Sequence, residues 1–386
     1  MKTAGIIAEY NPFHQGHAYH IEQTRQMTGA DYIIVVLSGD FVQRGAPAFL
    51  PRQERVRMAL EGGADLVFEL PSTHSCTSAE FFAESGVHLL NGLGCVDFLS
   101  FGSEAGEISQ LFQLADFLVQ EPESYRRVLQ TGLKSGLSFP AARQAALVEC
   151  FPDAAAVLAS PNNILGIEYC KALIRLQSPI RPVTVTRTGG GYHDTDFHQD
   201  FPSATAVRRH ILQQPREAQC SEQYHFPMEE EDFSLLFRYL LLTTGKEQLC
   251  SIQDISRDLA NRIYNCRYHF QSYGQFVSLL KTRELTYSRI SRALFHLFMD
   301  LQQIPTLSYA RLLGFRRCAA PLLGKIKESS TLPVVTKVST ASRILPPDAA
   351  ALLEQNIRIS ELYEAVRCEK YHTEFIHEFS RQLIIL

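Results

Sequence analysis

The sequence predicts an α/β protein in which a parallel-sheet domain precedes a mostly α-helical C-terminal domain. Two observations predict this fold class. In the first half of the 386-residue chain, short apolar runs alternate with helical stretches, as in a doubly wound parallel sheet. Beyond the acidic run at 228–232, the pattern is almost entirely helical. We therefore expect one domain at residues 1–225 and a second at residues 226–386.

Five apolar runs in the first half are the expected strands. They are rich in Val, Ile and Leu, so we expect both faces of each strand to be buried. The strands are expected at 4–8, 32–37, 65–69, 96–101 and 182–187. Helices are expected at 17–28, 51–62, 78–91, 106–121, 123–135, 139–147, 162–176 and 203–213.

The second half is predicted to consist of consecutive helices with few strands. Its apolar residues recur mostly at helical spacing, which favours an all-helical packing. Helices are expected at 233–243, 246–249, 254–264, 271–280, 286–300, 306–313, 320–328 and 347–365, with short strands at 333–336 and 381–386.

Composition excludes several classes of protein. Hydrophobic residues make up 45% of the chain and charged residues 20%, which is ordinary for a globular domain. Nine cysteines occur without a CxxC pair, so we expect free thiols and neither zinc nor haem. No apolar run reaches the roughly 20 residues of a membrane span, and the N-terminus runs directly into a strand. We expect a cytoplasmic protein without membrane contact.

Charge is distributed unevenly along the chain. Residues 1–232 carry a net charge of −11, whereas residues 233–386 carry +7. The stretch 311–343 holds seven basic residues and one acid. A basic half indicates contact with a polyanion, although an ordinary solvated surface would give the same pattern.

The most informative motif lies directly after the first expected strand. It is Asn11-Pro12-Phe13-His14-Gln15-Gly16-His17, and a helix is expected to begin at its end. A helix N-terminus offers N–H groups and a positive dipole to an anion, and Gly16 permits close approach. The imidazoles of His14 and His17 can stabilise charge that develops on a phosphate. Histidines at this spacing could also be plain surface or core residues, but the strand–turn–helix context favours a phosphate site.

Polar residues also follow the later expected strands. Because ligands bind at the carboxyl ends of parallel strands, these residues should gather at one edge of the sheet. Each has a structural alternative, namely a local ion pair, a helix N-cap or a flexible loop. The candidates are Asp40 and Arg44, Gly102 and Glu104, Asn162 and Asn163, and Arg187 with the glycines at 189–191.

A second phosphate motif opens the helix expected at 203–213. Ser203 is a natural N-cap, which is the structural reading. Hydroxyls and an arginine at a helix start also suit a triphosphate, and Thr205 and Arg208 supply them here. This segment resembles the second signature of the HxGH nucleotidyltransferases, although Ala204 replaces the usual second serine.

Together the motifs resemble one family over essentially the whole chain. Ala8 to His14, Ser38 to Gly45, Phe101 to Glu104, Ser160 to Asn163 and Tyr192 to Asp194 are similar to the bacterial tRNA(Met) cytidine acetate ligases, as are Thr286 to Ile290 and Leu313 to Phe315. The resemblance implies a Rossmann-like nucleotidyltransferase fold of the HUP type. It also implies that ATP and acetate form acetyl-adenylate, whose acetyl group passes to the wobble cytidine of elongator tRNA(Met) to give N4-acetylcytidine.

The resemblance further implies roles for individual residues. It places His14, His17 and Asp40 in catalysis, and Mg²⁺ enters bound to ATP without protein ligands. The implied ATP-binding residues are Ile7, Ala8, Glu9, Tyr10, Asn11, Pro12, Phe13, His14, Gln15, Gly16, His17, His20, Gly102, Asn163, Arg187, Ser203, Thr205 and Arg208. The implied tRNA-binding residues are Lys281, Arg283, Arg289, Arg292, Arg316 and Arg317.

Two other functions are open to this sequence. The first 230 residues alone would suit an adenylyl- or cytidylyltransferase that acts on a small molecule, but the basic second half would then have no role. A non-catalytic RNA-binding protein is also conceivable, although intact His14, Gly16 and His17 argue against it. His74 and Cys76 do not form a nucleophile pair in sequence terms, since nothing supplies a third orienting group.

Overall fold

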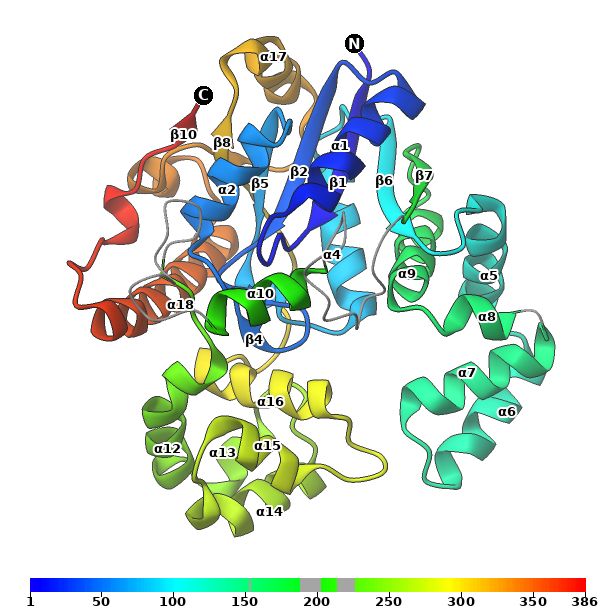
Figure 1. Cartoon of the computed structure of the whole chain (residues 1–386), viewed down its shortest axis with the longest axis vertical. Helices are drawn as coiled ribbons and strands as arrows, with labels where there is room; N and C mark the ends of the chain where they lie inside the picture. Colours follow the sequence, from blue (N-terminus) through cyan, green and yellow to red (C-terminus); the bar gives the residue numbers. More distant parts are fainter. Residues whose placement is uncertain (153, 188–202, 214–225) are drawn as a thin grey trace.

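The chain folds into a mostly parallel sheet covered by helices on both faces, with a helical region beyond one edge of the sheet (Figure 1). The computed structural model describes residues 1–152, 154–187, 203–213 and 226–386. The glycines at 189–191 and the segment from Tyr192 to Asp194 lie outside the described residues.

The main sheet has the strand order β10-β8-β5-β2-β1-β6-β7, with β9 paired to β8. The strands β5, β2, β1, β6 and β7 are mutually parallel, and β8 runs antiparallel to β5. All five strands predicted in the first half are confirmed. The strands are β1 (Thr3–Ala8), β2 (Tyr32–Ser38), β5 (Leu66–Leu70), β6 (Phe98–Ser103), β7 (Arg181–Thr186), β8 (Ala310–Phe315), β9 (Val334–Val335) and β10 (Ile384–Ile385), and β3 (Phe41–Val42) pairs with β4 (Ala46–Pro47) in a separate hairpin.

Alternate residues of each central strand belong to two different cores. In β1, Ile6 packs in the core beneath α1 and α2, whereas Ile7 packs in the core beneath α4, α5 and α9. This burial on both faces explains the continuous apolar runs in the sequence. The helices of this part are α1 (Gln15–Thr28), α2 (Arg52–Glu61), α3 (Ser72–Ser75), α4 (Ala79–Gly92), α5 (Ile108–Gln120), α6 (Glu123–Lys134), α7 (Phe139–Cys150), α8 (Ala154–Leu158), α9 (Pro161–Arg175), α10 (Ala204–Gln213), α17 (Ala320–Ser329) and α18 (Pro347–Tyr371).

The helical region has a core of its own that is rich in aromatic rings. Phe237, Tyr273 and Phe295 stack against one another with ring centroids 4.9–5.4 Å apart. Phe41 of the β3–β4 hairpin inserts into this core and contacts Phe295 at 5.3 Å, so the hairpin ties the helical region to the sheet. The helices here are α12 (Ser234–Thr243), α13 (Lys246–Cys250), α14 (Arg257–Cys266), α15 (Tyr273–Leu280) and α16 (Tyr287–Met299).

One predicted helix is wrong. The segment 306–313 was expected to be helical, but Ala310–Phe315 forms strand β8 against β5. A short apolar run does not distinguish a buried helix from a buried strand, and the free edge of β5 decides the outcome. Because β8, β9 and β10 rejoin the main sheet, the predicted boundary at 225/226 does not separate the sheet from the helices.

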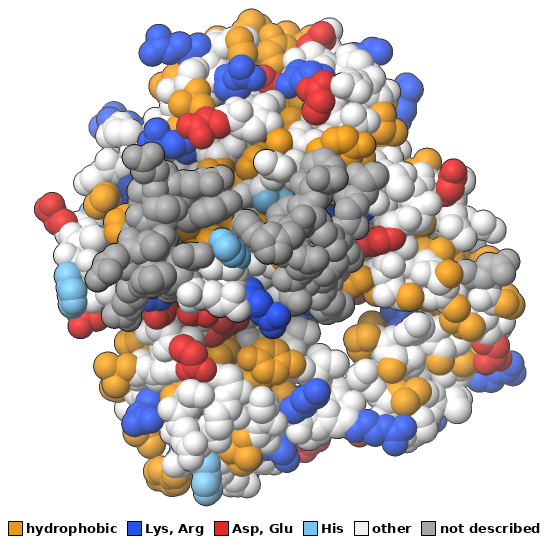
Figure 2. Space-filling model, viewed as in Figure 1, with side chains coloured by type: hydrophobic (Ala, Val, Ile, Leu, Met, Phe, Trp, Pro, Cys, Tyr) orange, Lys and Arg blue, Asp and Glu red, His pale blue; other side chains and the backbone are white. Residues whose placement is uncertain are grey.

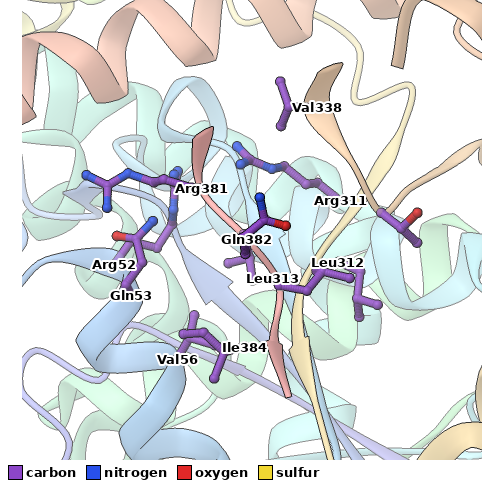
Figure 3. Close-up of a pocket in the computed structure, with 12 residues that line it drawn as sticks. Arg52, Gln53, Val56, Arg311, Leu312, Leu313, Val338, Arg381, Gln382 and Ile384 are labelled. Atoms are coloured by element: carbon purple, nitrogen blue, oxygen red, sulfur yellow. The ribbon is translucent and has the colours of Figure 1, made fainter. Parts of the chain in front are cut away.

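A buried network of charged side chains fastens the C-terminal segment to this sheet. Arg52 of α2 contacts Asp40, Glu69 and Glu378, and Arg311 of β8 contacts Glu69 and Glu378. Figure 3 shows Arg52, Arg311 and Arg381 converging on a small cavity of about 30 Å³ beside β10. We refer to Asp40, Arg52, Glu69, Arg311 and Glu378 as the ionic network. Among the described residues, no helix is long and apolar enough to cross a membrane.

Candidate functional site

A cavity of about 530 Å³ opens at the carboxyl ends of β1, β6 and β7. Ala8 and Glu9 follow β1, Gly102 lies in β6, and Arg187 follows β7. The first turns of α9 and α10 and the side of α16 complete its wall. The sequence-predicted residues that line it are Ile7, Ala8, Glu9, Tyr10, Asn11, His14, Gly16, His17, His20, Arg44, Gly102, Asn162, Arg187, Ser203, Thr205, Arg208 and Arg292.

His14 and His17 form a stacked pair at the start of α1. Their ring centroids are 3.7 Å apart. Nδ1 of His14 accepts from the Gly16 amide at 3.1 Å, and Nδ1 of His17 accepts from the His14 amide at 3.2 Å. A neutral imidazole has one acceptor and one donor nitrogen, so each Nε2 carries the proton. The two rings therefore act as the helix cap through Nδ1 and keep Nε2–H available as a donor.

All three histidines of this helix start are neutral at pH 7. Burial, assisted by Arg187 and Arg208, lowers the pKa of His14 to about 4. Burial and the neighbouring His14 lower the pKa of His17 well below its usual range. Burial and Arg187 lower the pKa of His20 to about 4, and its Nε2 lies 3.0 Å from Ser100 Oγ. A bound polyanion would raise these pKa values, because its negative charge would favour the protonated imidazoles.

The second motif lies against the first. Nη1 of Arg208 donates to the Asn11 carbonyl at 2.6 Å, and Nη2 donates to Thr205 Oγ1 at 3.2 Å. Ser203 caps α10, since its Oγ accepts from the Ala206 amide at 3.1 Å. The structural interpretation of Ser203 as a helix cap is thus confirmed, and the start of α10 also lines the cavity that the histidine pair lines.

The loop after β6 is organised by two asparagines, and only one reaches the cavity. Asn163 is buried, accepts from the amides of Glu104 and Ala105 at 2.9 and 3.1 Å, and donates to the Val157 carbonyl. Its polar atoms are thus used within the protein, and it does not line the cavity. Asn162 does line it and donates to Glu104 Oε1 at 2.6 Å. The expected ligand contact from Asn163 is therefore corrected to a positioning role for the loop.

Other predicted residues also lie outside the cavity lining. Asp40 is buried 3.2 Å from Arg52 Nη1 as part of the ionic network, so the expected catalytic role does not fit its position. Pro12 and Phe13 are buried behind the motif, where Phe13 packs beneath Tyr10 and Gly62. Gln15 is exposed in the first turn of α1 and does not line the cavity.

Arg55 of α2 is a residue that the sequence analysis missed. It is fully buried, and burial lowers its pKa. Its guanidinium donates to the carbonyls of Leu50, Glu9, Ser38 and Gly39 at 2.5–3.0 Å. It thereby joins the chain after β1 to the chain after β2 directly behind the cavity. No local sequence pattern predicts this role, since an arginine in a helix normally lies at the surface.

Two polar residues of the β1–α1 turn, the half-buried Glu9 and the buried Tyr10, line the cavity. Burial raises the pKa of Glu9, although the Gln43 amide and three arginines lower it in part. Burial also raises the pKa of Tyr10, whose hydroxyl has no hydrogen-bond partner among the described residues. Tyr10 has φ of 45°, in the left-handed region that non-glycine residues seldom adopt. Such backbone strain is typical of sites that position a ligand.

One wall of the cavity is apolar. Phe82 of α4, Phe101 of β6, and Leu165 and Tyr169 of α9 form it. The sequence analysis named Phe101 as part of a motif and did not single out the other three residues. Flat apolar walls beside a cluster of phosphate-binding groups suit the base of a nucleotide.

The predicted basic residues fall into two separate groups. Arg292 lines the cavity together with Ser288, one helical turn away on α16, and Lys281 and Arg283 are exposed on the loop before that helix. Arg289 is half-buried on the same helix. Arg316 and Arg317 lie at the opposite edge of the sheet, where the Arg316 amide donates to the Asp65 carbonyl at the start of β5. The structure does not bring these two groups together.

Comparison with known proteins assigns the chain to a family. The model of the HIGH nucleotidyl transferases matches residues 1–376. The tRNA(Met) cytidine acetate ligase of Acetivibrio thermocellus is 35% identical, with all of both chains covered. That of Clostridium kluyveri is 39% identical over 94% of this chain and 98% of the relative. The chain belongs to the tRNA(Met) cytidine acetate ligase family.

Solved structures of the family share the fold of this chain. TmcAL of Thermotoga maritima, in its apo form, superposes with a TM-score of 0.92 at 28% identity, covering both chains completely. The same protein bound to alpha-thio ATP gives a TM-score of 0.89, again at 28% identity and with complete coverage. The predicted fold class, a nucleotidyltransferase-type parallel sheet with a helical part, is thus confirmed.

Proposed function

We propose that this protein joins acetate to the wobble cytidine of elongator tRNA(Met) at the expense of ATP, with acetyl-adenylate as the intermediate. The names of its relatives support this activity. The observation that carries the proposal is one cavity shared by two parts of the chain. The histidine pair and Arg208 line one side, and Ser288 and Arg292 of the helical region line another.

In the first step, an acetate oxygen attacks the α-phosphorus of ATP. A P–O bond to acetate forms, the P–O bond to pyrophosphate breaks, and the electron pair leaves with pyrophosphate. Nε2–H of His14 and of His17 would donate to the oxygens on which negative charge builds up. Arg187 and Arg208 would hold the phosphates of the leaving group. The remaining predicted lining residues, including His20, Gly102, Ser203 and Thr205, would shape the ATP site.

Magnesium would enter this site bound to ATP. The described residues contain no group of three or more His, Cys, Asp or Glu side chains placed to hold a metal ion. When bound between phosphate oxygens, Mg²⁺ would neutralise the charge of the leaving pyrophosphate. Glu9 is the carboxylate among the described lining residues. Burial raises its pKa, which disfavours the charged form that a metal ion requires.

In the second step, the exocyclic amine of the cytidine attacks the acetyl carbonyl. The N–C bond forms, the C–O bond to the adenylate breaks, AMP leaves, and the amine loses one proton. Acyl activation suits this reaction, because the amine of cytosine is a poor nucleophile. A wobble base lies in a single-stranded loop and can be turned into a protein pocket. Lys281, Arg283, Arg289 and Arg292 would hold the RNA beside the cavity, whereas Arg316 and Arg317 follow β8 at the end of the sheet away from it.

Acetyl transfer from radiolabelled acetate tests the proposal. Purified protein with ATP, Mg²⁺ and a tRNA(Met) transcript should place one acetyl group on the wobble cytidine and release one AMP and one pyrophosphate for each. A transcript with uridine at the wobble position is the control and should accept none. Because the acceptor is a tRNA, we place the activity in the cytoplasm.

Absence of transfer by folded protein would overturn the proposal. Isolation of a stable nucleotide adduct of a small molecule, formed without tRNA, would instead favour the alternative of a small-molecule adenylyl- or cytidylyltransferase.

A further inference from the structure

A helical arm between β6 and β7 has no role in the nucleotide site. The arm comprises α5, α6, α7 and α8, which together span residues 108–158. The strands β6 and β7 are parallel neighbours, and α9 alone would suffice to connect them. None of the described residues of the arm lines the cavity. The helices α6 and α7 pack mainly on each other and project away from the sheet (Figure 1).

The tip of the arm meets the helical region. Gly136 lies in the turn between α6 and α7 with φ of +80°, and a Cβ there would lie 3.4 Å from Glu284 Oε1. Glu284 belongs to the segment 281–286, which connects α15 to α16. Two segments that are far apart in the sequence thus lie side by side at their tips.

Both segments lead from this meeting point to the cavity. On one side, α8 of the arm runs into α9, whose Pro161 and Asn162 line the cavity. On the other side, the segment 281–286 runs into α16, whose Ser288 and Arg292 line it.

Unpaired basic side chains mark both segments. Arg127 and Lys134 are exposed on α6 and lie seven residues apart, which puts them on the same helix face. Lys281 and Arg283 are exposed on the opposing segment. Within the part of the chain that the structure describes, none of these four side chains forms an ion pair. Figure 2 shows Lys and Arg side chains on both the arm and the neighbouring side of the helical region.

We propose that the arm and the segment 281–286 together form the surface that binds the backbone of a single-stranded RNA loop. The arm would contribute Arg127 and Lys134, and the helical region would contribute Lys281 and Arg283. The phosphates would bridge the two segments, and Arg292 would hold the strand where it enters the cavity. This inference rests on the proposed function, since the RNA is the acceptor of the acetyl group.

Paired charge removals test the role of the arm. Arg127→Gln with Lys134→Gln should weaken binding of the full tRNA(Met) transcript about fivefold to tenfold at 0.1 M salt. The slope of log affinity against log salt should fall by about 1 to 2, as expected when one or two phosphate contacts are lost. Acetate-dependent exchange of pyrophosphate into ATP, which needs no RNA, reports that the variant is folded and forms the adenylate.

A matched variant removes the same charge elsewhere. Arg317→Gln with Lys327→Gln also deletes two exposed cations, from the edge of the sheet opposite the cavity. It should leave the tRNA affinity and the salt slope within twofold of the original protein. Equal weakening by both pairs would overturn the proposal, because only overall charge would then matter.

Unchanged binding of tRNA by the Arg127 and Lys134 variant would also overturn it. In that case normal acetyl transfer by the unaltered protein would leave the proposed function standing. Failure of the unaltered protein to transfer acetate to tRNA would instead overturn the proposed function itself.

Discussion

Two clusters of polar side chains lie on opposite sides of the loop after β2. They differ in the balance between their basic and acidic groups. In the ionic network, Arg52 and Arg311 are surrounded by the carboxylates of Asp40, Glu69 and Glu378. In the cavity, Arg187 and Arg208 lie close enough to the neutral His14 to lower its pKa. Among the described lining residues Glu9 is the only carboxylate, and burial raises its pKa, while Glu104 lies 3.8 Å from Arg187. The first cluster pairs two arginines with three carboxylates, whereas the second holds more basic than acidic side chains.

The pKa values of Glu378 in the ionic network and of His14 in the cavity reflect the same difference. Burial raises the pKa of Glu378, but Arg52 and Arg311 outweigh it and bring the value to about 2. Burial, assisted by Arg187 and Arg208, lowers the pKa of His14 to about 4. A buried group without its partner costs free energy, so the protein keeps this deficit only where a ligand can remove it. This difference indicates that the ionic network stabilises the fold, whereas the excess of basic groups in the cavity suits an anionic ligand.

Breaking the ionic network should give the largest loss of stability. Glu378→Gln removes the carboxylate that faces Arg52, Arg311 and Arg381. Removing one partner of a buried ion pair costs about 3–5 kcal/mol. We expect the free energy of unfolding in urea to fall by about that amount, with little change in the affinity of the folded protein for ATP. A stability change below 1 kcal/mol would show that the network does not fasten the C-terminal segment.

Removing a donor from the cavity should affect rate rather than stability. In His14→Asn, the amide oxygen can still cap the Gly16 amide, since Asn is a good N-cap, but the Nε2–H donor is gone. Loss of one donor to a developing oxyanion costs about 10²–10³ in rate. We expect acetate-dependent pyrophosphate exchange to fall by that factor while the melting temperature changes little. Equal losses of rate and stability would contradict the comparison.

Arg55 lies between the two clusters and should affect both. Arg55→Lys keeps the charge but cannot reach all four carbonyls that the guanidinium contacts. An unsatisfied buried acceptor costs about 1–3 kcal/mol. We expect a stability loss in this range and a KM for ATP raised about tenfold, with kcat changed less because His14 and His17 remain. A large loss of kcat at unchanged KM would rule out this positioning role.

Acid should weaken the fold through the buried histidines. The folded-state pKa values of His14 and His20 lie near 4, below the unfolded value of about 6.5. The unfolded chain therefore binds more protons as the pH falls, and stability declines from about pH 6.5 downward to about pH 4. Each of these histidines should contribute about 1 kcal/mol between pH 6.5 and 5.5. Urea unfolding at several pH values measures the decline.

The His14→Asn variant is the control for this pH dependence. The loss of stability of this variant at low pH should be smaller by the contribution of one histidine. Burial also lowers the pKa values of His74 and His296, so these two residues still contribute. An identical pH profile in the variant and the original protein would show that His14 is not held neutral by the fold.

The sequence by itself determined the local chemistry of this protein. The apolar runs predicted the five strands from β1 to β7, because strands buried on both faces need apolar residues throughout. The spacing of His14, Gly16 and His17 predicted a helix start built for an anion, since the cap and the donors lie within one turn of chain. Ser203 to Arg208 followed from the same local logic, and these segments do line one cavity.

Only the tertiary structure decided which of the polar residues face that cavity. Asp40 and Asn163 have the right residue types and positions in sequence, but a neighbouring Arg52 and two backbone amides occupy their polar atoms. Arg55 acquired its role because four carbonyls from three segments converge on it. Strand β8 formed because β5 offered a free edge. These outcomes depend on partners distant along the chain, which local sequence patterns do not encode.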